Sequence, residues 1–163
     1  MPSTTIEVLR TAPIFLGTIL TTQRISQYYA FSTFLSKELP DRDRPAFKSW
    51  FRIMCPRFLN IVEFITVVQY VLLAVNTGLT PYHNHALLRS KILYGVALAL
   101  GLLPFACFLK MLKLYRGMMD EKTTPEDSLR MLDTWLKINN WRIWGTEVPA
   151  LLIIFAAIVN AWG

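Results

Sequence analysis

The fold of this chain is decided by one segment, WLKINNWRIWGTEVP (135–149), which opens the last long apolar run at 150–162. A membrane-length helix here would carry Asn139, Arg142 and Glu147 at or inside its first turns. A charge at membrane depth costs roughly 2.5–3.5 kcal/mol on insertion scales, so such residues persist where they face a bundle interior and find partners. The segment therefore predicts a helical membrane bundle with internal partners for its charges.

The composition supports a membrane protein. The chain has 163 residues, of which 53% are hydrophobic and 17% are charged, and its mean hydropathy is +0.37. Soluble domains are usually less apolar, and this length is typical of one domain, here 1–163. The net charge of +6 does not predict nucleic-acid binding, because the basic residues cluster in particular loops and no nucleic-acid motif is present. The two cysteines, Cys55 and Cys107, imply no disulfide framework.

Four stretches are long enough to cross a bilayer, which takes about 20 mostly apolar residues. We therefore expect an all-α fold, a bundle of four transmembrane helices at about 13–35, 53–75, 92–112 and 138–162. A soluble helical bundle is disfavoured, because the third stretch and the later part of the second are apolar on every face. The first stretch is interrupted by Gln23, Arg24 and Gln27, and the second by Arg57, Asn60 and Glu63.

The loops predict an orientation. Lysine and arginine are frequent at 36–52 and 113–137, whereas the opposite side has only Arg10, Arg89 and Lys91. Loops rich in these residues stay in the cytoplasm. We expect both long loops to be cytoplasmic and both termini to be lumenal, in a membrane of the endoplasmic reticulum.

Both long loops are expected to contain short interfacial helices. Thr124 can cap a helix in which Pro125 takes the first position and Glu126 and Asp127 lie at the positive end. This helix either continues into the fourth span or lies on the membrane surface. In the loop 36–52 we expect a turn and then a short helix that places Trp50 at headgroup level.

The topology brings the polar residues of the spans to one half of the bundle. One interpretation is a set of structural ion pairs, Arg24 with Glu63 and Arg142 with Glu147. The other follows from an excess of cations over carboxylates, accompanied by several amides, which suits a cavity for an anionic or phenolic ligand.

Metal binding is not expected. His83 and His85 form a His-x-His motif in the lumenal loop, but no cysteine or carboxylate lies nearby in the sequence, and a solvated loop is the favoured interpretation. The chain has no phosphate-binding loop, nucleophile elbow or zinc-protease motif. We therefore predict no bound metal, flavin or haem.

Three features together resemble a known family. They are Trp135-x-x-x-Asn139-x-x-Arg142, Arg57-x-x-Asn60, and a third helix that contains Pro104. The chain resembles the anthrone oxygenase-like family, small four-helix integral membrane proteins common in fungal polyketide gene clusters. The resemblance implies oxidation of a lipophilic aromatic polyketide by O2 without another cofactor.

The chemistry implied by this resemblance assigns roles to the polar residues. An anthrone has an acidic CH2 group, and its enolate can react with O2 directly if the protein supplies a base, cations and a dry pocket. The expected catalytic residues are Glu63 as base, Arg142 and Arg24. The expected substrate-binding residues are Arg57, Asn60, Gln27, Asn139, Glu147 (also the second choice of base) and Trp135.

Two other classes of function stay open. One is a membrane-bound cyclase or isomerase of a terpenoid or polyketide, which would use the same residues without O2. The other is a non-catalytic membrane subunit or carrier. The expected partners are a lipophilic small molecule and the lipid bilayer, with self-association open and no nucleic acid.

Overall fold

The computed structural model describes residues 4–81 and 84–162, and every regular element in this part is helical. A strand is absent from these two ranges. The elements in chain order are α1 (Thr4–Ser32), η1 (Thr33–Leu35), α2 (Ala46–Leu79), α3 (His85–Leu102), η2 (Leu103–Cys107), α4 (Phe108–Met119), α5 (Pro125–Arg142), η3 (Ile143–Glu147) and α6 (Val148–Trp162).

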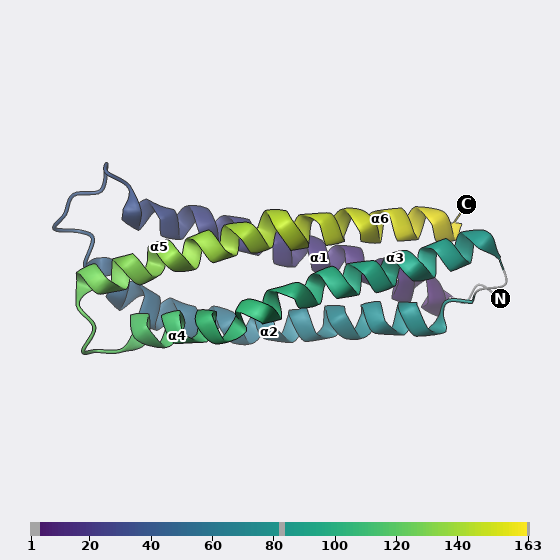
Figure 1. The fold of residues 1–163 in the computed structure, drawn as a ribbon, viewed down its shortest axis with the longest axis horizontal. Coiled ribbons are helices and arrows are strands. Elements are labelled where there is room, and N and C mark those ends of the chain that lie inside the picture. Colours follow the sequence, from purple (N-terminus) through teal and green to yellow (C-terminus); the bar gives the residue numbers. More distant parts are fainter. Residues whose placement is uncertain (1–3, 82–83, 163) are drawn as a thin grey trace.

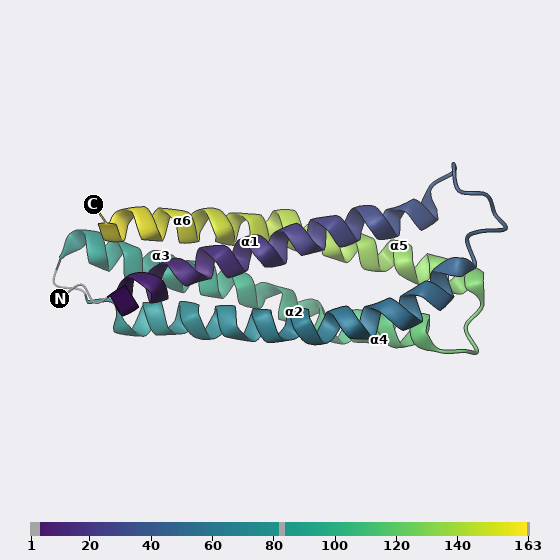
Figure 2. The ribbon, with the colours of Figure 1, turned by 180° about the vertical axis from the view of Figure 1, so that it is seen from behind.

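The elements form an elongated bundle of four rods. The first two rods are α1 and α2, the third is α3–η2–α4, and the fourth is α5–η3–α6. Figures 1 and 2 show the rods lying lengthwise beside one another, with the two termini and the start of α3 at one end. The loops 36–45 and 120–124 lie at the other end, which we call the loop end.

Three of the rods are long and apolar enough to cross a membrane: 46–79, 85–119 and 125–162. The stretch expected as the first span, 13–35, lies mostly in α1, which is not among them. Its threonines and the polar residues Gln23, Arg24 and Gln27 interrupt the apolar run. The structure thus supports a membrane-associated helical protein with three candidate spans and a fourth, more polar rod.

The rods are longer than the predicted spans. The 34 residues of α2 measure about 51 Å at 1.5 Å per residue, well beyond a hydrocarbon core of about 30 Å. The short helix expected in the loop 36–52 is therefore corrected, because 46–52 form the first turns of α2. For the helix that begins after Thr124, the structure shows the first of the two expected arrangements, since α5 runs on into η3 and α6. The predicted cap is confirmed, since the Thr124 hydroxyl accepts a hydrogen bond from the Asp127 amide at 3.1 Å.

Two hydrophobic cores follow one another along the bundle. The loop-end core is aromatic, and the terminal core contains more small side chains. Of the charged residues, Glu7, Arg10, Arg89 and Lys91 lie toward the termini, and the others lie in the middle or toward the loops. The terminal half is thus the part suited to lipid. The loop-end core consists of Phe31, Phe47, Phe51, Cys55, Met118, Leu132 and Leu136, and the terminal core of Leu73, Tyr94, Ala97, Ala150, Ile154 and Ala157.

Two rods change their helical form midway, each at or next to a proline, whereas Pro13 and Pro56 lie inside the regular helices α1 and α2. A proline lacks the backbone N–H and its ring conflicts with the carbonyl four residues earlier. Pro149 accordingly follows the π-helix η3, and Pro104 lies within the 3₁₀-helix η2. Figure 1 shows the α3–α4 and α5–α6 junctions at about the same position along the bundle. Both interruptions therefore lie between the two cores.

Candidate functional site

A group of polar side chains separates the two cores. On the fourth rod these residues follow Leu136 of the loop-end core and precede Ala150 of the terminal core. On α2 they lie between Cys55 and Leu73 in the same way. We call this group the polar layer, and its members are Gln23, Arg24, Gln69, Tyr70, Asn139, Arg142 and Glu147.

Two arginines share one carboxylate oxygen at the centre of the polar layer. Arg24 Nε lies 2.8 Å from Glu147 Oε1, and Arg142 Nη2 lies 3.4 Å from the same oxygen. These three side chains are 13–17% exposed. The predicted pair Arg142–Glu147 is therefore present, whereas Arg24, expected to pair with Glu63, contacts Glu147 instead. With two cations and one anion, the trio carries one surplus positive charge.

The π-helix makes the Arg142–Glu147 pair. Residues five apart do not share a face of an α-helix, where neighbours are three or four apart. A π-helix joins residue i to residue i+5, so η3 brings residues 142 and 147 to the same side. The Thr146 hydroxyl donates to the Arg142 carbonyl at 2.8 Å within this turn. The interruption of the α-helix before Pro149 therefore places Arg142 and Glu147 on the same side of the fourth rod.

A small cavity adjoins the shared carboxylate. Its volume is about 30 Å³, enough for a water molecule and far below the roughly 300 Å³ of ordinary ligand pockets. Close helix packing keeps it small: a Cβ at Gly17 would lie 2.9 Å from Gln69 Nε2 and one at Gly101 2.8 Å from the Tyr70 ring. The lining residues are Gly17, Leu20, Thr21, Arg24, Thr66, Gln69, Tyr70, Leu73, Ala97, Gly101, Glu147, Ala150 and Leu151.

Several buried atoms of the polar layer have no hydrogen-bond partner. They include Glu147 Oε2, Arg142 Nε, Asn139 Nδ2 and both amide atoms of Gln23. A buried polar atom without a partner costs roughly 1–3 kcal/mol, so most proteins contain few of them. Water molecules or a ligand would have to supply the missing hydrogen bonds.

The structure brings together some of the predicted site residues. Arg24, Arg142 and Glu147 are in contact, and Asn139 is buried one turn before Arg142. Gln27 is partly buried, three residues after Arg24 on α1. Trp135 belongs to the edge of the loop-end core, where its ring centre lies 5.4 Å from that of Phe31.

Three predicted residues lie elsewhere. The side chains of Arg57, Asn60 and Glu63 are exposed on α2. Their spacing does give them a common side, but the inward face of α2 contains Cys55 and Leu73. The expectation that these three residues face the interior of the bundle was wrong, because residue spacing predicts which positions share a face but not which way that face points.

Sequence reasoning missed Gln69 and Tyr70. Gln69 is 8% exposed, and its amide lies next to Gly17. Tyr70 donates a hydrogen bond of 2.5 Å to the Gly101 carbonyl beside the Pro104 interruption. A signal was available, since Gln69 is a lone amide in the apolar run FITVVQYVLL (64–73), where an amide without a partner is costly.

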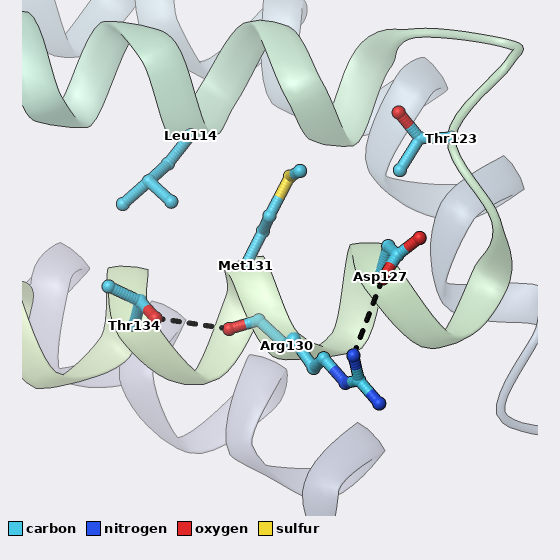
Figure 3. Close-up of a pocket in the computed structure, with 6 residues that line it drawn as sticks. All are labelled: Leu114, Thr123, Asp127, Arg130, Met131 and Thr134. Carbon is cyan, nitrogen blue, oxygen red and sulfur yellow. Dashed lines mark hydrogen bonds and ion pairs between the residues drawn. The ribbon is translucent and has the colours of Figure 1, made fainter.

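A second hollow lies at the loop end, between α4 and α5 (Figure 3). Its volume is about 310 Å³, and its polar groups bind one another. Arg130 pairs with Asp127 at 3.7 Å, and the Thr134 hydroxyl donates to the Arg130 carbonyl at 3.1 Å. Because the charged groups of this hollow pair with each other, it is a weaker candidate for a functional site than the polar layer. Its lining is Leu114, Thr123, Asp127, Arg130, Met131 and Thr134.

The described histidine, His85, is not part of the polar layer. His85 is exposed at the start of α3, and His83 lies outside the described residues. Within 4–81 and 84–162, no three histidine, cysteine, aspartate or glutamate side chains are grouped so as to hold a metal ion.

Comparison with known proteins found relatives in a fungus. The chain is 35% identical over 151 residues to the oxaleimides biosynthesis cluster protein N of Penicillium oxalicum, covering 90% of this chain and 85% of the relative. The protein of the same name from Penicillium oxalicum strain 114-2 / CGMCC 5302 matches to the same extent. No protein-family model matches the chain, and no solved structure matches it.

Proposed function

The chain belongs to the family of the oxaleimides biosynthesis cluster protein N, a fungal secondary-metabolite cluster protein, and from this we propose a membrane-bound biosynthetic enzyme. The activity that best fits the polar layer is a cofactor-independent, anthrone-type oxygenation of a lipophilic aromatic polyketide. One observation carries this proposal: Glu147 is held at Oε1 by two guanidinium groups, while its buried Oε2 has no partner.

The proposed reaction begins with removal of a proton from an activated CH2 group. The resulting enolate gives electrons to O2, and a C–O bond forms to give a hydroperoxide. Loss of water then leaves a new carbonyl, so that CH2 and O2 become C=O and H2O. Carbon is oxidised and O2 is the only oxidant, which is why the predicted absence of metal, flavin and haem remains part of this proposal.

The residues of the polar layer have distinct roles in this scheme. Glu147 accepts the proton at Oε2. Glu147 replaces Glu63 as the proposed base, because the Glu63 side chain is exposed. Arg24 and Arg142 hold the base and, with one surplus positive charge, favour the enolate over the neutral substrate. Asn139 and Gln27 remain proposed substrate contacts, and Trp135 borders the substrate from the loop-end core.

The membrane setting is proposed from charge and packing together. Because α1 lies lengthwise along three rods that are long enough to span, we infer that it crosses the membrane with them. The Lys- and Arg-rich loop end then faces the cytoplasm, with both termini in the lumen of the endoplasmic reticulum.

A cyclase or isomerase is the second candidate, because the shared carboxylate supports proton removal whether or not O2 follows. The two candidates have the same first step and differ in oxygen consumption. Deuterium exchange at the substrate CH2 under nitrogen measures the first step, and an oxygen electrode measures the second.

The experiment uses the purified protein in lipid nanodiscs with 1,8-dihydroxyanthrone. Glu147→Gln should lower oxygen uptake by about 100-fold or more, the usual size of a lost general base. Glu121→Gln is the matched control, since Glu121 is 77% exposed at the loop end, and it should keep the wild-type rate. Loss of activity in Glu63→Gln with retention in Glu147→Gln would return the base to Glu63. Deuterium exchange without oxygen uptake would support the isomerase instead.

A further inference from the structure

Two unpaired donors project from one face of α5. Asn139 is 6% exposed and its Nδ2 has no hydrogen-bond partner. Arg142, three residues later, has a buried Nε that also lacks one. Residues three apart on a helix are neighbours on one face, so the two donors lie side by side. Acceptor oxygens of a ligand would satisfy both.

Packed side chains close both ends of the polar layer. Toward the loops, the ring centre of Phe31 lies 5.7 Å from that of Phe51 and 5.4 Å from that of Trp135. Toward the termini, Tyr94 and Ile154 are fully buried. Protein cores are close-packed, so a molecule approaching along the bundle axis would have to unpack one of them.

Exposed apolar side chains lie on the third and fourth rods near the polar layer. Phe105 on η2 is 55% exposed, Trp141 near the end of α5 is 47% exposed, and Trp144 within η3 is 59% exposed. Exposed tryptophans of this kind are typical of the boundary between lipid and water. A molecule arriving from the side therefore comes from the membrane and must be lipophilic.

The regular helix is interrupted on that side. The third rod passes through η2 and the fourth through η3 at about the same position along the bundle (Figure 1). The segment η3 packs against α3, the helix that runs directly into η2, so the two interruptions lie on neighbouring rods. Mid-helix 3₁₀ and π segments often mark hinges and functional positions. Glu147, the last residue of η3, lines the 30 Å³ cavity, so an opening beside η3 would lead to it.

We propose that a lipophilic ligand with two acceptor oxygens on one edge enters sideways from the membrane, between η2 and η3, and binds Asn139 and Arg142. The reaction that the bound ligand undergoes is taken from the proposed function, and in that respect this proposal rests on it. It adds the route of entry and the pair of donors that holds the ligand's oxygen-bearing edge.

Cys107 is a reporter for this seam, because it is partly exposed and Cys55, the other cysteine, can be replaced by alanine. The protein is placed in phosphatidylcholine vesicles under nitrogen, so that no turnover occurs. N-cyclohexylmaleimide should label Cys107 at least about tenfold faster than a charged sulfonate thiol reagent applied from either side. Saturating 1,8-dihydroxyanthraquinone should slow this labelling about tenfold, whereas anthracene, which has no oxygens, should not.

Variants separate ligand binding from general packing. Asn139→Leu should raise the dihydroxyanthraquinone concentration needed for protection about tenfold, the value of one hydrogen bond, with unchanged labelling in the absence of ligand. Asn160→Leu is the matched control, since the Asn160 amide already donates to the Ala156 carbonyl at 2.8 Å, and it should keep the wild-type protection.

Two results would overturn the proposal. Labelling by the charged reagent at the rate of the lipophilic one would show an aqueous route. Protection that is absent, or that survives in Asn139→Leu, would remove the donor pair. Because no O2 is present, protection without later oxygen uptake would refute only the proposed oxygenase, and oxygen uptake without protection would refute only this inference.

Discussion

The Arg24–Glu147–Arg142 trio makes a quantitative prediction about stability. Replacing Glu147 by glutamine leaves two guanidinium groups that are each more than four-fifths buried and no longer share a carboxylate. Removing one partner of a buried ion pair typically costs about 3–5 kcal/mol. Arg24→Met costs less, because it leaves Arg142 and Glu147 as a neutral pair, and we expect about 1–2 kcal/mol.

The double variant Arg24→Met/Glu147→Gln gives the more specific prediction about stability. It leaves one unpaired cation instead of two, so it should be more stable than Glu147→Gln alone by about 1–2 kcal/mol. Contacting residues in one network commonly show coupling of 0.5–3 kcal/mol. For a chain of this length, 1 kcal/mol corresponds to about 2–4 °C in Tm. Glu147→Gln should therefore lower Tm by about 6–20 °C, and the second substitution should restore part of the loss.

The assay is thermal unfolding in nanodiscs followed by the fluorescence of the five tryptophans. Asp133→Asn is the control, because Asp133 pairs with Lys137 on the exposed side of α5, where ion pairs contribute about 0–1 kcal/mol. Additive Tm shifts from the two single variants would refute the shared-carboxylate reasoning, as would a Glu147→Gln shift no larger than that of the control.

Four other predictions concern helix packing, helix capping, metal content and membrane orientation. Gly101→Ala should destabilise by about 1–3 kcal/mol, because its Cβ would lie 2.8 Å from the Tyr70 ring, and Tyr70→Leu in the same chain should relieve part of this in the same unfolding assay. Thr124→Ala should cost about 1 kcal/mol by removing the α5 cap, and Thr123→Ala should be nearly neutral. Purified protein should contain no stoichiometric iron or copper by elemental analysis and should keep its activity after chelation; activity lost on chelation and restored by one metal would contradict this. In a chain with Cys55 and Cys107 replaced by alanine, a cysteine at Asp43 should be labelled from the cytoplasmic side of microsomes, and lumenal labelling would reverse the orientation.

The sequence predicted the features that depend on local chemistry. The apolar runs and the charge distribution predicted long helices with polar residues between apolar segments. Thr124 and Pro125 predicted the start of α5, because capping needs only neighbouring residues. The cost of burying charge predicted that Arg142 and Glu147 would find partners.

The sequence did not predict the features that depend on how the helices pack against one another. Glu63 seemed a suitable base because it interrupts an apolar run, yet the direction in which α2 turns that residue depends on packing against the other rods. The pairing of residues 142 and 147 was expected, but the π-helix before Pro149 that makes it possible was not, and regular α-helical spacing would have put the two residues on different sides. The approach of Tyr70 to Gly101 joins positions 31 residues apart, which no periodicity connects.

The central claim is that the polar layer oxygenates a substrate carbon with O2, using Glu147 as base. The most direct measurement supplies ¹⁸O2 to purified wild-type protein with 1,8-dihydroxyanthrone and determines by mass spectrometry the oxygen in the product. We expect one ¹⁸O atom in the new carbonyl of each product molecule, the second in water, and product formation lowered about 100-fold or more in Glu147→Gln. Product whose new oxygen comes from water, or equal labelled product from wild type and Glu147→Gln, would contradict it.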